Sequence, residues 1–342
     1  MKKSHNPTLE DVAREAKVST ATISRSINEP HKVAQPTLER IEDVIKRLGY
    51  TPNFGGKVLA SNHSNTIGAI IPTMSNSMFA SGLQSFQEVL ALAGKKLLVA
   101  SAGYNSENEL EQIRSLVTHG ADALLLIGST RPQETLDFLA IRKIPYVISW
   151  CYKDVADRIY SGFDNEKAAR SIAQKVLEYG HRKIAMIAGQ TKGNDRAANR
   201  IAGVRSAIRD YSNSAELVHL VEANYSLDDG GMAFEQIMSA GTPPTAVICG
   251  NDVLAAGAIV KARSLSIDIP KQVSITGFDD ISLASAVFPS LTTVRVPQIE
   301  MGKTAAKQLL KLLAKDPGVS SIEFETQIIM RDSLVRFSAE SK

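Results

Sequence analysis

Short apolar runs alternate with longer amphipathic stretches from residue 66 onward, and this alternation limits the possible folds more than any other feature. Near-continuous apolar strands separated by helices predict parallel sheets that are covered by helices on both faces. The apolar runs cover 67–72, 96–102, 123–128, 145–150, 183–189, 218–223, 245–250 and 274–280. The helix-length stretches between them include 80–93, 107–119, 166–179, 199–211 and 253–265.

The first four runs and the second four form two similar halves, so we expect two doubly wound α/β lobes side by side. Open lobes of this kind bind a small ligand in the cleft beyond the carboxyl ends of their strands. The segments 292–297 and 322–330 are also strand-like and are expected to cross between the lobes.

The N-terminal stretch 8–28 predicts a different structure, two short helices separated by a tight break. Thr8 and Asp11 have the spacing of a capping box, so the first helix should begin directly after Thr8. Ser19 is a suitable N-cap for the second helix. With a third helix over 35–48, these elements predict a small helical headpiece.

The outer face of the second helix is small and polar except for one long cation. Such a face can enter a DNA major groove without collision, with its N-terminal residues nearest the base edges. The pattern therefore predicts a helix-turn-helix DNA reader, although any helical hairpin with a wet outer face would look similar. The residues of this face are Thr20, Ala21, Thr22, Ser24 and Arg25.

Charge is distributed unevenly along the 342 residues. Residues 1–60 hold ten Lys and Arg against seven Asp and Glu, whereas the remainder holds 29 of each kind. The whole net charge of +3 therefore lies in the headpiece, which is where a phosphate backbone would need it.

The headpiece resembles that of the LacI/GalR family of bacterial transcription regulators. TLEDVAREAKVSTATISRSIN at 8–28, GYTPN at 49–53 and LA at 59–60 carry the resemblance, which extends over essentially the whole chain. Within the family, GFDN at 162–165 and GYNSENE at 103–109 are similar to gluconate-utilisation repressors. The resemblance implies a small all-α helix-turn-helix headpiece and an α/β periplasmic-binding-protein-like core of two doubly wound parallel-sheet lobes.

The resemblance also implies boundaries. The headpiece covers 1–51, a hinge helix and linker cover 52–64, the core covers 65–334 and a tail covers 335–342. Within the core we expect an N-lobe of about 65–161 plus 294–321, and a C-lobe of about 162–293 plus 322–334.

Further DNA-contacting positions follow from the resemblance alone. In similar proteins the hinge helix pairs with that of a dimer mate in the minor groove, where the residue matching Leu59 wedges into the central base step. Other matching positions touch the DNA backbone or the groove rim, although Tyr50 could equally pack in the headpiece core. These positions are Asn28, Lys32, Tyr50 and Asn53.

Polar side chains gather where the predicted strands end. A polyol requires carboxylates and amides for its hydroxyls, an arginine with donors in a fork, and an aromatic face for its C–H side. Each such residue alone could equally cap a helix or brace a loop. In similar proteins the matching positions line the effector site, and here they are Asn76, Phe79, Phe163, Arg200, Asn251 and Asp279.

Arg131 follows the third predicted strand, and two roles are open for it. It could pair with the carboxylate of a sugar-acid effector, or it could be a solvated loop cation. Most similar proteins are repressors that a sugar or sugar acid releases from DNA, whereas a minority need a nucleobase or a partner protein. The resemblance therefore favours a repressor of sugar or sugar-acid catabolism that is released by an inducer such as gluconate, although the sequence leaves open whether the effector releases or promotes DNA binding.

Common enzyme motifs are absent from the sequence. Gly302-Lys303-Thr304 resembles the end of a phosphate loop, but the required glycine five residues earlier is Pro297. The two cysteines and six histidines lack metal-ligand spacing. We therefore expect no catalytic residue, cofactor or metal. A sugar receptor or sugar-converting enzyme, whose N-terminal helices serve only dimerisation, remains the alternative.

Location and assembly follow from what the sequence lacks. No apolar run is long enough to span a membrane, and the N-terminus lacks the apolar segment of a signal peptide, so we expect a cytoplasmic protein. Cys151 and Cys249 lie in strand-like runs and should be buried, reduced thiols. A homodimer on double-stranded operator DNA is expected, because residues 335–342 are too few for a heptad-built tetramer bundle.

Overall fold

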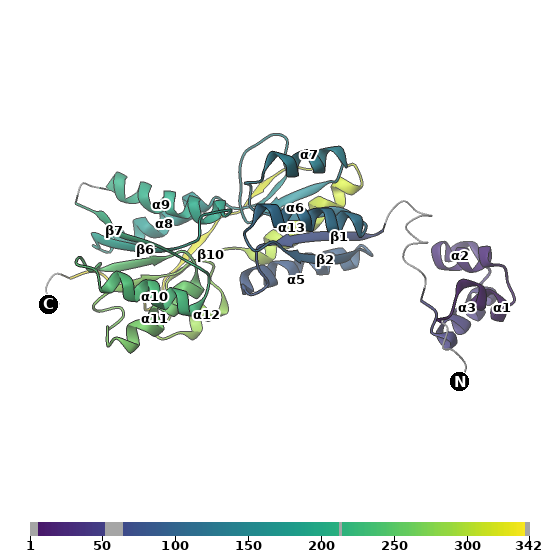
Figure 1. Cartoon of the computed structure of the whole chain (residues 1–342), viewed down its shortest axis with the longest axis horizontal. Coiled ribbons are helices and arrows are strands. Elements are labelled where there is room, and N and C mark those ends of the chain that lie inside the picture. Colours follow the sequence, from purple (N-terminus) through teal and green to yellow (C-terminus); the bar gives the residue numbers. More distant parts are fainter. Residues whose placement is uncertain (1–5, 52–63, 212–213, 339–342) are drawn as a thin grey trace. The chain divides into compact units, whose positions relative to one another are not determined.

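The computed structural model describes residues 6–51, 64–211 and 214–338 (Figure 1). The chain divides into two compact units, a headpiece, Met1–Ser64, and a core, Asn65–Lys342. The predicted hinge, including Asn53 and Leu59, lies outside the described residues.

The headpiece contains the three predicted helices. The capping box at the start of the first helix is confirmed: the Thr8 backbone N–H donates to Asp11 Oδ2 at 3.0 Å, and the Asp11 N–H donates to Thr8 Oγ1 at 3.2 Å. These hydrogen bonds to Thr8, together with the charge of Arg14, lower the pKa of Asp11 to about 2. The elements are α1 (Leu9–Ala16), α2 (Thr20–Asn28), a 3-10 turn η1 (Pro30–Lys32) and α3 (Gln35–Leu48).

The headpiece core is made by one apolar face from each helix. Ile23 is fully buried, and Ile27 packs against the same cluster, so the apolar side of α2 faces inward. Tyr50 also packs against this cluster. The remaining buried members are Val12, Ala13, Ala16, Ile41 and Val44.

The N-lobe is a six-stranded parallel sheet in the order β11-β5-β4-β3-β1-β2. Helices cover both of its faces, as the apolar strands predicted. Its strands are β1 (Thr66–Ile71), β2 (Lys96–Ser101), β3 (Ala121–Ile127), β4 (Tyr146–Ser149), β5 (Tyr160–Gly162) and β11 (Ile322–Glu323), and its helices are α5 (Ser77–Leu92), α6 (Ser106–Thr118), α7 (Gln133–Ile141) and α13 (Gln298–Leu313).

The C-lobe is a four-stranded parallel sheet in the order β7-β6-β8-β9. Its strands are β6 (Lys183–Gly189), β7 (Glu216–Ala223), β8 (Ala246–Cys249) and β9 (Ser274–Thr276), and its helices are α8 (Asn165–Glu178), α9 (Asp195–Tyr211), α10 (Leu227–Met238), α11 (Asp252–Ser264) and α12 (Ser282–Ala286).

The chain crosses between the lobes along two antiparallel strands, β10 (Thr293–Arg295) and β12 (Gln327–Ile329) (Figure 1). β10 leads from the C-lobe to α13 in the N-lobe, and β12 leads back. The predicted continuous strand over 322–330 is thus two strands. Ile322 and Glu323 pair with β5, so the N-lobe sheet extends to residue 323 and the return crossing begins after β11.

One helix of the C-lobe forms despite two glycines in its sequence. Helix α10 contains Gly230 and Gly231, which are poor helix formers. A Cβ on Gly230 would lie only 2.5 Å from the Leu254 carbonyl oxygen, so the glycine permits a close approach of α10 to α11. Tertiary packing therefore outweighs the low local propensity.

The two cysteines are free and buried, which confirms the predicted reduced thiols. Burial raises the pKa of the Cys151 thiol to about 12. Within the described residues, no helix combines the length and apolar character needed to cross a membrane.

We expect Thr8→Ala to destabilise α1 by about 1 kcal/mol, because the variant loses the side-chain half of the capping box. Hydrogen exchange on the whole chain should show faster exchange of the α1 amides. Ser19→Ala is the matched control, since Ser19 caps α2 and its loss should act there first. Equal acceleration of both helices in both variants would contradict independent caps.

Candidate effector cleft and DNA-reading face

The predicted DNA-reading residues lie on the open side of α2. Thr20, Ala21, Ser24 and Arg25 are exposed and Thr22 is half-buried. The Thr22 N–H donates to Ser19 Oγ at 3.1 Å. Of the positions taken from the family, Asn28 and Lys32 are exposed as well. Lys32 pairs with Glu29 at 2.7 Å. Roles in DNA binding stay predictions.

The core brings five of the seven predicted effector residues to one small pocket, which we call the inner pocket. It lies where strands of both lobes end, and its volume of about 10 Å³ is near that of one water-sized probe. Its lining includes the predicted residues Asn76, Phe79, Arg200, Asn251 and Asp279, together with Met78, Tyr104, Asn194, Arg196 and Tyr225.

Both predicted asparagines cap a helix with their side-chain oxygen. Asn76 caps α5, where its Oδ1 accepts from the Met78 N–H at 3.0 Å, and Asn251 caps α11 through the Leu254 N–H at 2.9 Å. The Nδ2 of Asn251 is buried and has no hydrogen-bond partner in the described residues. A buried donor without a partner is costly, so a ligand acceptor at this atom would stabilise the site.

Arg200 is held rigidly by three neighbours. Its Nε donates to Asn165 Oδ1 at 2.9 Å, its Nη1 donates to the Gly250 carbonyl at 2.6 Å, and its Nη2 lies 3.5 Å from Asp279 Oδ1. The guanidinium also stacks over the Phe278 ring, 3.7 Å from its centroid. Nε and Nη1 are thus hydrogen-bonded, whereas Nη2 takes part only in the longer ion pair with Asp279, whose Oδ1 has no hydrogen-bond partner in the described residues.

Two buried carboxyl groups adjoin the inner pocket. Burial raises the pKa of Asp279 to about 7, although the positive charge of Arg200 opposes the shift. Burial and the nearby charge of Asp279 raise the pKa of Asp252 to about 8. Near neutral pH these groups therefore hold protons that ordinary aspartates would have lost.

Two predicted residues lie elsewhere. Phe163 is buried and stacks on Phe278, with ring centroids 6.1 Å apart, and it is not in the lining of the inner pocket. Arg131 is not a solvated loop cation, since only 1% of its side chain is exposed. Its Nη2 contacts Glu109 Oε1 at 3.0 Å, and its two terminal nitrogens donate to the Gly128 and Ile127 carbonyls.

Sequence reasoning missed two tyrosines that face each other across the cleft. Tyr104 follows β2 in the N-lobe, Tyr225 follows β7 in the C-lobe, and their ring centroids are 5.7 Å apart. Asn194 Nδ2 donates to the Tyr225 hydroxyl at 3.1 Å. Both tyrosines follow strand ends, which is the signal that identified the other residues.

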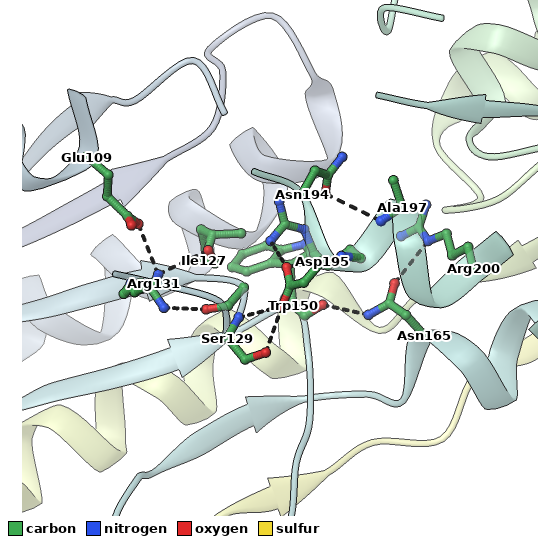
Figure 2. A network of polar contacts seen from close by, with 12 residues as sticks. Glu109, Ile127, Ser129, Arg131, Trp150, Asn165, Asn194, Asp195, Ala197 and Arg200 are labelled. Carbon is green, nitrogen blue, oxygen red and sulfur yellow. Dashed lines mark hydrogen bonds and ion pairs between the residues drawn. The ribbon is translucent and has the colours of Figure 1, made fainter. Parts of the chain in front are cut away.

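Polar contacts join the two lobes (Figure 2). The Ser129 N–H and Oγ both donate to Asp195 Oδ2, at 2.6 and 2.7 Å. Asn165 Nδ2 donates to the Trp150 carbonyl at 2.9 Å, while its Oδ1 accepts from Arg200. Burial would raise the pKa of Asp195, but the charge of Arg196 and the hydrogen bonds from Ser129 outweigh burial and lower it.

Two larger cavities adjoin the inner pocket, and both lie between residues of the two lobes. A side cavity of about 380 Å³ is lined by residues that include Ile71, Thr130, Arg131 and Arg196. An outer cavity of about 810 Å³ is lined by residues that include Thr73, Glu107, Lys192 and Asn224. Tyr104 lines all three spaces, so it divides the cleft. Both volumes suit a small ligand.

A helix-turn-helix headpiece joined to a two-lobed core with a polar cleft defines a ligand-responsive DNA-binding regulator. Residues 8–53 match the family of bacterial regulatory proteins, lacI family, and residues 173–334 match the periplasmic binding protein-like domain. HTH-type transcriptional repressor CytR of Escherichia coli K12 is 30% identical over 327 residues, which are 95% of this chain and 96% of CytR. The chain belongs to the lacI family of bacterial regulatory proteins, which confirms the resemblance seen in the sequence.

Solved structures agree in fold. A LacI-family transcriptional regulator from Silicibacter pomeroyi is 26% identical and covers 96% of this chain and 100% of its own, with a TM-score of 0.88. A complex of the transcriptional regulator CelR with cellobiose is 25% identical and covers 96% of this chain and 99% of its own, with a TM-score of 0.71.

We expect the two raised carboxyl pKa values to make the core less stable as pH rises. Between about pH 4 and 8 the folded state holds protons that the unfolded carboxyls release, so the free energy of unfolding falls through this window. Asp279→Asn should flatten the decline by up to about 1 kcal/mol per pH unit, measured by denaturant unfolding.

Comparison with the wild type is needed, because burial lowers the pKa of His181 and this gives the opposite slope below about pH 6.5. Asp228→Asn, at an exposed position on α10, is the control and should keep the wild-type slope. An unchanged slope in Asp279→Asn would mean that Asp279 is already ionised in the folded protein.

Proposed function

We propose that this protein is a repressor of sugar or sugar-acid catabolism genes that binds a pseudo-palindromic operator as a homodimer in the cytoplasm. The observation that carries the proposal is the exposed, small and polar face of α2, in a headpiece that also holds the net positive charge. Phosphate contacts supply affinity, and the α2 side chains supply base readout.

The same face argues against the alternative that the headpiece is only a dimerisation arm. The apolar residues of α2 pack inside the headpiece, and its outward residues are polar or small. Ala21 suits a thymine methyl group, and Arg25 suits a guanine edge or a phosphate. A dimerisation arm would instead require an outward apolar stripe.

Exposed apolar residues on the core support the homodimer. Strand β2 lies at a sheet edge and exposes Leu98 and Val99. In the C-lobe, Val260 on α11 is 62% exposed and Phe288 is 90% exposed. Edge strands and exposed large apolar side chains favour coverage by a second chain.

The inner pocket supports a polyhydroxylated effector. It offers carboxyl, amide and guanidinium groups beside the aromatic ring of Phe79. The complex of the similar regulator CelR contains cellobiose, and the segments similar to gluconate-utilisation repressors favour a sugar acid. We therefore take gluconate as the first candidate inducer.

Control of DNA binding would pass through the crossing strands. The Asp279 N–H donates to the Val294 carbonyl of β10 at 2.8 Å. The next residue, Asp280, accepts from Arg295 at 2.7 Å and from Arg331 at 2.6 Å, and these arginines flank the two crossings. An effector that moves Asp279 would therefore move the strands that set the lobe geometry. The coupling is reciprocal, so the inducer must bind the DNA complex more weakly.

Arg25→Ala should lower operator affinity by about tenfold, because it removes a base or phosphate contact. Effector affinity should not change, since α2 lies outside the core. Arg40→Ala is the control, as Arg40 is exposed on α3 rather than on the reading face, and it should cost less operator affinity. Equal loss of operator and effector affinity in Arg25→Ala would argue that the headpiece is part of the ligand domain.

Selection of duplexes from a random-sequence pool at physiological salt tests the proposal directly. We expect recovery of an inverted repeat with a central CG step, and loss of binding when gluconate is added. An inverted repeat that is indifferent to gluconate would retain the repressor and reject this inducer. Enrichment of no sequence would reject operator binding and favour the receptor or enzyme alternative.

A further inference from the structure

The inner pocket and the side cavity meet at two residues, Tyr104 and Arg196, which line both spaces. The inner pocket alone is too small for a sugar, whereas the side cavity has the volume of an ordinary ligand site. A ligand that contacts Asp279 and also extends into the side cavity must therefore pass Arg196.

Three buried arginines surround this path, and in two of them each terminal nitrogen already forms a hydrogen bond or an ion pair. Arg200 is engaged at Nε, Nη1 and Nη2, as described above. Both terminal nitrogens of Arg131 donate hydrogen bonds, to Glu109 and to two backbone carbonyls. Its Nε is buried without a partner in the described residues, but a single inner N–H cannot form a fork.

Arg196 differs from both. Its Nη1 contacts Asp195 Oδ1 at 3.0 Å, while neither Nε nor Nη2 has a hydrogen-bond partner within the part of the chain that the structure describes. Only 7% of its side chain is exposed. The guanidinium therefore keeps two donors on one edge, inside the cleft.

The position of Arg196 is set by the contact between the lobes. Asp195 is anchored to Ser129, and the Arg196 guanidinium lies over Gly128, where an added Cβ would be 2.0 Å from Nη1. Gly128 also has a φ of 82°, which favours glycine. A side chain fixed in this way loses little conformational entropy on binding a ligand.

We propose that Arg196 binds the carboxylate of the effector and makes the cleft prefer a sugar acid over the neutral polyol. A guanidinium edge with two N–H groups matches the two oxygens of a carboxylate, and burial strengthens this charge-assisted pair. The polyol chain then reaches Asn76, Asn251 and Asp279 in the inner pocket. This inference rests on the proposed sugar-acid effector, and it transfers to Arg196 the role that the sequence suggested for Arg131.

Calorimetric titration of the full chain tests the assignment with gluconate and galactonate, each beside the alditol of the same carbon skeleton. The wild type should bind at least one acid more tightly than its alditol. Arg196→Gln should lower the affinity for that acid by about tenfold or more, with a change of less than about threefold for the alditol. Arg196→Lys, which keeps the charge but not the fork, should restore part of the preference.

Arg209→Gln is the matched control, because Arg209 lies on the same helix α9 with 73% of its side chain exposed and lines none of the three spaces of the cleft. It should leave the preference intact. Retention of the acid preference by Arg196→Gln, or equal loss in Arg209→Gln, would overturn the assignment. A wild type that prefers no acid over its alditol would also overturn the assignment. Operator binding measured on the same samples would then show whether the proposed repressor function still holds.

Discussion

Two polar side chains at the starts of C-lobe helices join the lobes, and the cleft depends on them. Asp195 at the start of α9 accepts both hydrogen bonds from Ser129, and Asn165 at the start of α8 bonds the Trp150 carbonyl. Because buried polar groups must be paired, these contacts define which strand ends face each other. Loss of one partner would leave a desolvated group, so a small shift between the lobes has a large energetic effect.

The site uses groups that the fold already needs. Asn251 caps α11 with its oxygen and offers its nitrogen to the cleft. Asp279 is joined to the crossing strand β10 through its backbone, and its side chain faces Arg200. Ligand binding and the relative position of the lobes therefore depend on the same residues. That overlap gives a two-lobed binding protein a physical route from a small molecule to a distant surface.

Sequence patterns predicted most of the fold because the governing forces are local. The eight apolar runs became strands, and the caps at Thr8 and Ser19 began α1 and α2 where their side-chain chemistry indicated. Helix α10 forms even though Gly230 is a poor helix former, because the glycine permits close packing on α11. The expectation that polar residues at strand ends form the ligand site likewise identified Asn76, Arg200, Asn251 and Asp279 as pocket residues. It could not show which of the arginines keeps free hydrogen-bond donors.

The sequence by itself determined the two kinds of domain, the α2 face and the set of polar residues at the strand ends, because periodicity and capping act within a few residues along the chain. Only the tertiary structure decided which arginine keeps free donors. Arg131 pairs with Glu109 of a different segment, and Arg196 pairs with Asp195 at the start of α9. Hydrophobic periodicity carries no information about these contacts. Arg131 also donates to the Gly128 and Ile127 carbonyls, three and four residues earlier, and Arg200 donates to the distant Gly250 carbonyl. Arg196 keeps its two donors, and no pattern of residue types records that difference.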